Sequence, residues 1–181
     1  MLELGFATFF LNRTNRSGIV TGRPIGGMAQ EGKWNLTARY NKADLIKRVR
    51  RIAGHRDHVT VYRMEARDFI RRVLPSVPGR GFAFIDPPYY GRGSDLYRNT
   101  YMPRHHQLLA RCIAKSMQHK WIVTYDDSPD IRAMYAGFRQ KKYALSYSAA
   151  SRYVGAERLI VCPGLRIPRA AARCLPRWVP G

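Results

Sequence analysis

The segment Asp86-Pro87-Pro88-Tyr89 brings together three groups that could act on one ligand: a carboxylate, a backbone carbonyl and an aromatic ring. It follows the short apolar run Phe82–Ile85, whose aromatic and β-branched residues predict a buried parallel strand. The two prolines fix φ and donate no backbone N–H, so neither a strand nor a helix continues through them. The three groups are therefore expected at the carboxyl end of a strand, the edge where open α/β sheets bind ligands.

The same tetrapeptide resembles motif IV of the amino-methyltransferases, which transfer a methyl group from S-adenosylmethionine to an exocyclic NH2 group. The resemblance implies that the Asp86 carboxylate and the Pro87 carbonyl accept hydrogen bonds from the two hydrogens of adenine N6. These acceptors would turn the nitrogen lone pair toward the methyl group and stabilise the developing charge. Tyr89 would stack on the target base after the base leaves the duplex. Asp86, Pro87, Pro88 and Tyr89 are thus the predicted catalytic residues, and a proline-rich turn after a core strand is the alternative.

Other segments resemble, in the same order, the Dam-like, D12 class of DNA adenine-N6 methyltransferases. The resemblance spans about residues 4 to 162, with His105 standing where the class has an acidic residue. Asp68-Phe69 resembles motif III, which implies that both residues bind the adenine of S-adenosylmethionine, together with Asp86; a helix-start Asp is the alternative. The remaining matches before the Asp86 loop are Phe9-Phe10-Leu11-Asn12-Arg13-Thr14, Ser17-Gly18 and Gly32-Lys33-Trp34. Those after it are Gly93, Leu96-Tyr97, Asn99, Tyr101, His106, Leu109-Ala110, Trp121 to Asp127, Pro129, Ile131, Tyr135, Tyr147-Ser148-Ala149 and Gly155 with Glu157.

Residues 9–40 correspond to the target-recognition region of this class, which is rich in Gly and Arg here. The resemblance implies contacts with double-stranded DNA, since Arg and Asn suit the edges of guanine and adenine. A solvated loop is the equally weighted alternative for each residue. The predicted DNA-binding residues are Asn12, Arg13, Thr14, Arg16 and Lys33.

The class also has a Phe-x-Gly-x-Gly loop that wraps the methionine part of the cofactor, and this sequence contains no such loop. We therefore expect an incomplete Rossmann-like sheet that lacks its first strands, in a truncated, split or mis-started enzyme. Its methyl transfer would be impaired in this chain alone, and a second polypeptide is a candidate source of the loop. Unpaired backbone at the resulting gap would be costly if buried and adhesive if exposed.

The chain carries 32 basic and 12 acidic residues, a formal net charge of +20. Such a charge favours a polyanionic partner through phosphate contacts and counterion release. A generally basic proteome is the alternative, because Arg far exceeds Lys. No apolar run approaches the roughly 20 residues of a membrane span, and the first residues do not resemble a signal peptide, so we expect a cytoplasmic protein of bacterial or phage origin. No metal site is predicted, since the cysteines lack a C-x-x-C pair: Cys112, Cys162 and Cys174.

Periodicity predicts an α/β chain. Residues 1–163 are expected to form a partial methyltransferase domain, and residues 164–181 a basic, disordered tail. Helices are expected at Leu4 to Leu11, Lys42 to Ala53 with Asn41 as N-cap, from Glu65, at Arg104 to Ser116, and from Pro129 after the cap Ser128. Strands are expected at His58 to Tyr62, Phe82 to Ile85 and Trp121 to Tyr125, followed by an antiparallel hairpin of Tyr143 to Ala149 with Glu157 to Cys162.

The sequence is compatible with three functions. The resemblance favours a site-specific DNA adenine-N6 methyltransferase of a restriction-modification or phage type. A non-catalytic DNA-binding remnant or subunit would keep only the basic surface. A methyltransferase acting on cytosine N4, RNA or a glutamine side chain would share only the Pro-Pro-aromatic core of motif IV.

Overall fold

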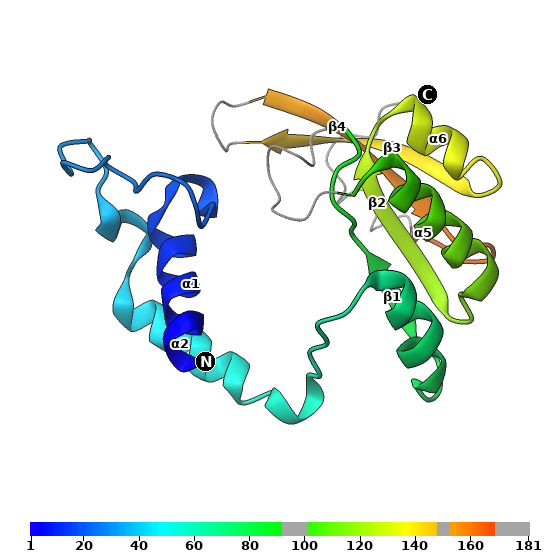
Figure 1. The fold of residues 1–181 in the computed structure, drawn as a ribbon, viewed down its shortest axis with the longest axis horizontal. Coiled ribbons are helices and arrows are strands. Elements are labelled where there is room, and N and C mark those ends of the chain that lie inside the picture. Colours follow the sequence, from blue (N-terminus) through cyan, green and yellow to red (C-terminus); the bar gives the residue numbers. More distant parts are fainter. Residues whose placement is uncertain (92–100, 148–152, 169–181) are drawn as a thin grey trace. The chain divides into compact units, whose positions relative to one another are not determined.

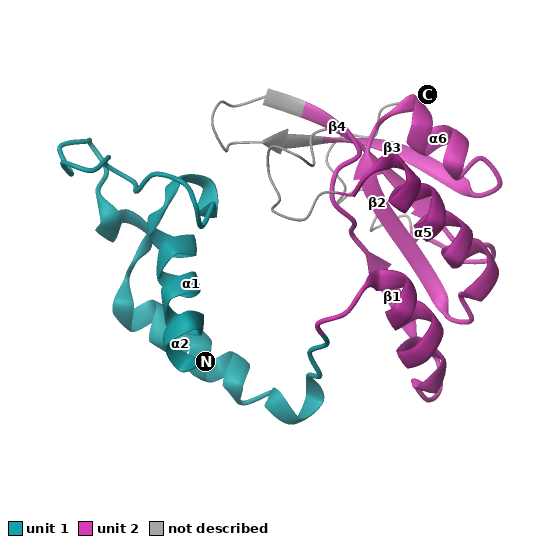
Figure 2. Ribbon diagram, viewed as in Figure 1, with its two compact units in different colours: residues 1–62, 149–151 teal, residues 63–148, 152–181 magenta. Residues whose placement is uncertain are grey.

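The computed structural model describes residues 1–91, 101–147 and 153–168 of the chain, drawn in colour in Figure 1. These residues divide into two compact units (Figure 2). Met1–Tyr62 form the first unit, and the described residues from Arg63 onward form the second. The segment predicted as one domain, residues 1–163, is therefore divided between two units.

The first unit is helical. Its elements are α1 (Leu2–Thr14), the short 3-10 turns η1 (Arg16–Gly18) and η2 (Leu36–Arg39), α2 (Lys42–Ala53) and a third 3-10 turn, η3 (Arg56–His58). The bounds predicted for α2 are confirmed, and so is its cap, because the Asn41 side chain accepts a hydrogen bond from the Asp44 N–H. A capping side chain satisfies an N–H that the helix itself leaves unpaired.

Two predictions in this unit are wrong. Helix α1 continues through Thr14 instead of ending near Leu11, so the Asn-Arg-Thr segment forms its last turn and not a loop. The predicted strand from His58 to Tyr62 is absent, because only the turn η3 and an irregular stretch occupy those positions. β-branched residues favour a strand only where a second strand satisfies their backbone groups.

The apolar residues of α2 were predicted to be buried, and most of them are exposed. Leu45 is buried, but Ile46 is 40%, Val49 50% and Ile52 68% exposed. The periodicity correctly indicated an amphipathic helix, yet the described elements of this structure leave most of its apolar side uncovered. Exposed apolar area of this extent is typical of surfaces that bind another element or molecule.

The second unit is an α/β structure with an open, four-stranded mixed sheet in the order β1-β2-β4-β3. Strand β1 is parallel to β2, whereas β4 is antiparallel to both β2 and β3, so the predicted hairpin is confirmed. The elements are α3 (Ala66–Asp68), a π-helical turn η4 (Phe69–Val73), a 3-10 turn η5 (Leu74–Ser76), β1 (Phe82–Ile85), α5 (Pro103–Ser116), β2 (Lys120–Asp126), α6 (Pro129–Met134), β3 (Arg139–Tyr147) and β4 (Tyr153–Val161).

Helices α5 and α6 pack their apolar residues with alternate residues of the sheet. The main core cluster combines residues of α5 and α6 with Trp121, Val123 and Tyr125 of β2 and Ile160 of β4. Because successive residues of a strand point to opposite faces, Ile122 joins a second, smaller cluster with Tyr143, Leu159 and Val161. The caps predicted for α6 hold as well, since the Ser128 hydroxyl accepts the Ile131 N–H at 3.2 Å and Pro129 opens the helix.

His105, the departure from the family pattern, lies at the start of α5. Its Nδ1 atom accepts a hydrogen bond of 3.1 Å from the Met102 N–H at the N-cap position. A carboxylate at this position would accept the same bond, as in a capping box. His105 therefore caps α5 without the negative charge that an acidic residue would bring.

Strand β1 is less buried than predicted. Ala83 and Ile85 pack against the main core, but Phe82 is 55% and Phe84 60% exposed. The strand lies at one end of the sheet order and pairs only with β2 among the described residues. A strand is apolar on both sides where both faces are covered, and the described part of the chain covers one face of β1.

The predicted disorder of the tail does not begin at Gly164. Leu165 and Ile167 pack against the smaller core cluster, because their apolar side chains cover the face that carries Tyr143 and Val161. The remainder of the predicted tail, residues 169–181, lies outside the described residues. Among the helices that the structure describes, none combines the length and apolar composition needed to cross a bilayer.

Candidate active site

The predicted catalytic loop leaves β1 at its carboxyl end. Parallel pairing places Ile85 opposite Val123, so the next residues, Asp86 and Thr124, lie side by side on the same edge. The Thr124 hydroxyl donates a hydrogen bond of 2.6 Å to Asp86 Oδ1. Asp86 is exposed while Thr124 is only 7% exposed, so a buried hydroxyl orients an accessible carboxylate. Such a bond fixes one carboxylate oxygen and leaves acceptor capacity on the other.

Asp126 holds the far side of the loop. Its Oδ1 accepts the Tyr90 N–H at 2.7 Å, and its Oδ2 accepts the Gly91 N–H at 3.0 Å. A Cβ atom at position 91 would lie 3.3 Å from that second oxygen, which favours glycine there. Both bonds are charge-assisted and replace the strand pairing that Pro87 and Pro88 prevent. The loop is therefore fixed at both ends by β2.

Tyr89 is anchored to the antiparallel part of the sheet. Its hydroxyl donates a hydrogen bond of 3.1 Å to Glu157 Oε1, and the Tyr143 hydroxyl donates to Glu157 Oε2. Glu157 is 7% exposed, and it is the register partner of Tyr143 across the β3–β4 ladder. Burial raises the pKa of Tyr143, and the neighbouring Glu157 carboxylate raises it further, so the phenol stays protonated.

His106 of α5 connects the loop to the segment that carries Asp68. Its buried ring lies edge-on to Tyr90 at 5.1 Å, Tyr101 at 5.3 Å and Tyr125 at 5.5 Å between ring centroids. Burial lowers the pKa of His106, which favours the neutral ring at neutral pH. Its Nδ1 lies 2.9 Å from the Tyr125 hydroxyl.

Asp68 and Phe69, the predicted cofactor residues, lie at the junction of α3 and the π-helical turn. The Asp68 side chain is 46% exposed, with the Arg72 guanidinium 4.0 Å away, and Phe69 is partly buried. Glu65 is the N-cap of α3, and its carboxylate also accepts a hydrogen bond of 3.2 Å from the Tyr101 hydroxyl. Tyr101 and His106 thus connect Glu65, at the start of the segment that carries Asp68, to Tyr90 of the Asp86 loop.

The predicted DNA contacts of the first unit differ in their accessibility. Thr14 is 1% exposed and its hydroxyl donates to the Phe10 carbonyl, so in this structure its side chain is structural and not a surface contact. Asn12 donates to the Gly18 carbonyl, and Arg13 donates twice to the Arg39 carbonyl, so both organise the turns that follow α1. Arg16 and Lys33 are exposed, with the Lys33 ammonium 5.9 Å from the Trp34 ring centroid.

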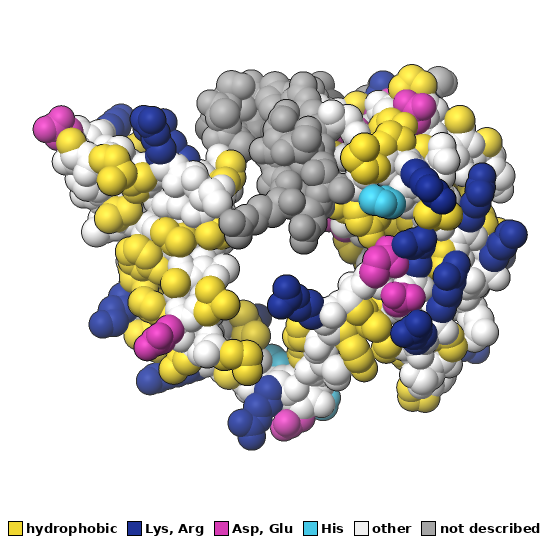
Figure 3. All heavy atoms as spheres, in the orientation of Figure 1, with side chains coloured by type: hydrophobic (Ala, Val, Ile, Leu, Met, Phe, Trp, Pro, Cys, Tyr) yellow, Lys and Arg dark blue, Asp and Glu magenta, His cyan; other side chains and the backbone are white. Residues whose placement is uncertain are grey.

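Basic side chains also gather over the helices of the second unit (Figure 3). Exposed cations there include Arg71 and Arg72 of the π-helical turn and Arg104, Arg111 and Lys115 of α5. A surface with several cations and few carboxylates attracts phosphate groups without regard to sequence. The second unit therefore carries a basic surface that the sequence analysis did not assign.

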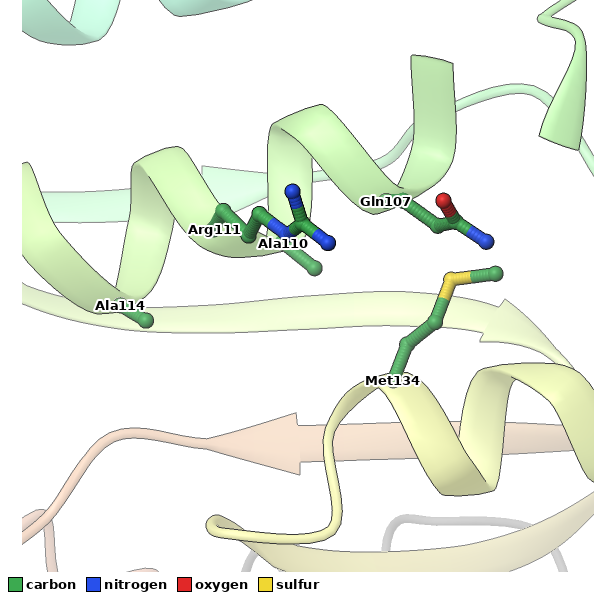
Figure 4. Close-up of a pocket in the computed structure, with 5 residues that line it drawn as sticks. All are labelled: Gln107, Ala110, Arg111, Ala114 and Met134. Carbon is green, nitrogen blue, oxygen red and sulfur yellow. The ribbon is translucent and has the colours of Figure 1, made fainter. Parts of the chain in front are cut away.

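A small hollow lies between α5 and α6, with a volume of about 230 Å³. It is lined by Gln107, Ala110, Arg111, Ala114 and Met134, and the Gln107 and Met134 side chains approach each other from the two helices (Figure 4). None of the predicted catalytic or cofactor-binding residues lines it. In the described part of the chain, no group of three or more His, Cys, Asp or Glu side chains could hold a metal ion.

The sequence analysis placed four residues in segments that resemble the class but assigned them no role in holding the loop: Thr124, Asp126, Glu157 and His106. The sequence did contain a signal for Thr124 and Asp126. Both are polar residues at the carboxyl end of an apolar strand, and such ends of parallel strands meet at the edge of the sheet where Asp86 was expected. Glu157 gave a weaker signal, as a carboxylate inside the apolar run that became β4. His106 belongs to a segment that resembles the class, but no local pattern indicated that its ring is buried.

A scan of protein-family models and a search of curated proteins give no match to this chain. The functional assignment therefore depends on the residues and geometry of the site.

Removing the Thr124 hydroxyl should slow the methyl transfer that the sequence predicts at Asp86, without unfolding the second unit. We expect Thr124→Val to lower the rate about tenfold, the equivalent of about 1.4 kcal/mol in activation free energy. The reason is that Asp86 loses the bond that orients its carboxylate. Thr124→Ser retains the hydroxyl and is the matched control. Equal rates for the valine and serine variants would show that this bond does not position Asp86.

Asp127 should make the second unit acid-sensitive. Its side chain is 7% exposed and accepts hydrogen bonds of 2.8 and 2.6 Å from Arg158, with Lys142 at 3.4 Å. Burial raises the pKa of Asp127, but the bonds and charges of Arg158 and Lys142 outweigh it and lower the pKa below the ordinary 3.8. A depressed folded-state pKa stabilises the fold above the ordinary value, and this stability is lost as the pH falls through the folded value.

Urea unfolding of the wild type and Asp127→Asn as a function of pH measures this contribution. The difference in unfolding free energy should be constant above about pH 5 and shrink below about pH 4. A difference that does not change with pH would mean that Asp127 does not titrate with folding.

Proposed function

We propose that the chain is a site-specific DNA adenine-N6 methyltransferase of the Dam-like, D12 class, of a restriction-modification or phage type. In this proposal the open sheet of the second unit is part of a Rossmann-like sheet. The observation that carries the proposal is the Asp86 loop, in which an accessible carboxylate follows a parallel strand and is oriented by Thr124, while Asp126 holds the far side of the loop. Electrostatic preorganisation of this kind is what a weak amine nucleophile requires.

The proposed reaction begins when the extruded adenine stacks on Tyr89. One N6 hydrogen is donated to Asp86, whose Oδ1 already accepts the Thr124 hydroxyl, and the other is donated to the Pro87 carbonyl. The nitrogen lone pair then points away from the ring, and N6 forms its new bond to the methyl carbon as the bond between that carbon and sulfur breaks, with its electron pair left on sulfur. As that bond forms, N6 becomes positively charged, and Asp86 stabilises this charge and is the nearest base for the departing proton.

S-adenosylmethionine, when bound, supplies the methyl group on a positively charged sulfur. The Asp68 carboxylate could accept a hydrogen bond from its adenine amine, and the Phe69 ring could pack on the adenine. In this proposal Asp68 and Phe69 form the adenine end of the site, whereas the sequence has no Phe-x-Gly-x-Gly turn for the methionine end. We propose that a second polypeptide completes the site, which agrees with the exposed Phe82 and Phe84 on β1.

The isolated chain should consequently bind S-adenosylmethionine poorly. We expect a dissociation constant near or above about 1 mM, equivalent to no more than about 4 kcal/mol of binding free energy. Equilibrium dialysis with labelled S-adenosylmethionine measures this value. Micromolar binding, with turnover on duplex DNA, would show that this chain holds the methionine end by itself.

The basic composition favours one further candidate, a DNA-binding subunit without catalytic activity. Product analysis separates the candidates. Extracts of cells that express the chain with its native flanking coding sequence are incubated with methyl-labelled S-adenosylmethionine and duplex DNA, RNA or protein. The proposal predicts label in duplex DNA as N6-methyldeoxyadenosine. Label in N4-methyldeoxycytidine, RNA or protein would favour another amino-methyltransferase, and DNA binding without transfer would favour the subunit.

A further inference from the structure

Tyr89 is held at both of its ends before any substrate arrives. Its backbone follows Pro87 and Pro88, and the next two amides are bound by Asp126. Its hydroxyl lies 3.1 Å from Glu157 Oε1. A ring fixed at the backbone and at its para oxygen has lost most of its rotational freedom about both side-chain bonds.

We infer that Glu157 is a positioning residue that holds the Tyr89 ring as a preformed stacking face beside Asp86. The inference rests on the proposed function, in which Tyr89 receives the extruded adenine. Glu157 is the additional residue that determines where the Tyr89 ring lies. Glu157 comes from β4, on the opposite side of β2 from the loop-bearing strand β1, so the antiparallel hairpin takes part in the site.

A carboxylate suits this role because it accepts hydrogen bonds at both oxygens and donates none. Tyr89 and Tyr143 each donate to a different oxygen of Glu157. Both donors can approach together only when the acceptor has no N–H group. Glutamine at position 157 would turn its NH2 group toward one phenol, and that phenol would lose the acceptor for its proton.

Burial strengthens the arrangement. Glu157 is 7% exposed, where a hydrogen bond to a charged acceptor is stronger than in water. Burial and the Glu157 carboxylate together raise the pKa of Tyr143, so this donor keeps its proton throughout the neutral range. Tyr143 and Glu157 are register partners on adjacent strands, and the Tyr143 hydroxyl holds the Glu157 oxygen that does not contact Tyr89. Glu157 is therefore a rigid anchor for Tyr89.

The advantage to the reaction is that the ring need not be ordered when the base arrives. Ordering one side chain at the moment of binding typically weakens association about three- to tenfold. Loss of the anchor should therefore reduce capture of the base by about this factor. The rate of the captured complex should change less, because Asp86 and Thr124 are not altered.

Fluorescence of 2-aminopurine tests the anchor without requiring methyl transfer. The probe is a single-stranded oligothymidine with one central 2-aminopurine, whose emission is quenched when the base stacks on an aromatic ring. We expect quenching by the wild type, and a concentration for half-maximal quenching that is three- to tenfold higher for Tyr89→Phe and for Glu157→Gln. The double variant should match either single variant, because both remove the same contact.

Tyr89→Phe removes a hydroxyl and keeps the ring, so it tests the anchor even if Glu157→Gln fails to fold. Tyr143→Phe is the matched control, since it removes the other phenol of Glu157 and leaves the Tyr89 contact in place. We expect it to affect quenching less than Tyr89→Phe does. Additive losses in the double variant, or wild-type quenching by Tyr89→Phe, would overturn the positioning role.

The methyl-transfer assay separates this inference from the proposed function. If both hold, Tyr89→Phe and Glu157→Gln raise KM for DNA more than they lower kcat. If no substrate is methylated but the quenching results are as expected, the methyltransferase proposal fails and the anchored stacking face stands. If adenine is methylated but the variants leave quenching and KM unchanged, the anchor fails and the proposed function stands.

Discussion

Asp86→Ala is expected to lower the rate of adenine methylation by about 10²- to 10³-fold, the usual effect of removing one preorganised polar group from a transition state. Asp86 is the exposed carboxylate of the loop, and its described hydrogen bond is with Thr124. Methyl transfer from labelled S-adenosylmethionine, measured with the chain in its native coding context, gives the rate. DNA affinity, measured by a filter-binding titration, should change less than about twofold. Affinity for DNA depends mainly on basic side chains that would contact phosphate, and Asp86 is acidic.

A charge-matched control is available in Asp57→Ala. The Asp57 side chain is 84% exposed and lies in the first unit, 3.6 Å from Arg56. Both variants remove one negative charge, so a general effect of net charge on DNA binding would appear in both. Methylation that persists in Asp86→Ala would remove this carboxylate from the mechanism.

Asp126→Ala is expected to destabilise the second unit by about 2–4 kcal/mol, because each hydrogen bond to a charged acceptor contributes roughly 1.5–3 kcal/mol. The variant leaves the Tyr90 and Gly91 N–H groups without the carboxylate that accepts them. It should also reduce activity, since the loop that carries Asp86 loses its second attachment to β2. Urea unfolding followed by circular dichroism measures the change in stability.

Hydrogen exchange locates the effect within the unit. The amides of Tyr90 and Gly91 should lose protection in Asp126→Ala to a greater extent than the amides of α5. Asp126→Asn keeps one acceptor oxygen and should fall between the wild type and the alanine variant. Unchanged exchange at Tyr90 and Gly91 would show that Asp126 does not hold the loop.

Local signals in the sequence predicted several elements of both units well. Asn41, Ser128 and Pro129 mark helix starts by short-range chemistry, and the runs that became β1 and β2 carry enough apolar residues to define strands. The hairpin followed from alternation, although β3 begins at Arg139, earlier than the predicted Tyr143. Helix caps and the apolar pattern of a strand are determined by residues that lie close together in the sequence.

Features that depend on a distant partner were predicted poorly. Val59 and Val61 favour a strand, but no strand among the described residues pairs with them, and both are exposed. Phe82 and Phe84 suggested a strand buried on both faces, although β1 has one covered face and one paired edge. Sequence alone carries the preference of a residue for burial, whereas burial itself requires the element that covers it.

In the candidate site, too, the residues of the local motif were predicted and the residues that contact it from distant positions were not. Asp86 and Tyr89 could be named because they adjoin two prolines in a compact motif. Thr124 and Glu157 contact that motif from positions 38 and 68 residues away in the chain. Their role depends on the strand order β1-β2-β4-β3, which no local pattern specifies.

The most direct test is the content of N6-methyldeoxyadenosine in genomic DNA. The chain, with its native flanking coding sequence, is expressed in a bacterial host that lacks DNA methyltransferases, and digested DNA is analysed by mass spectrometry. The proposed function predicts N6-methyldeoxyadenosine above the empty-vector level, located by sequencing within one short sequence context. Accumulation of the folded protein with no N6-methyldeoxyadenosine, or with N4-methyldeoxycytidine in its place, would contradict it.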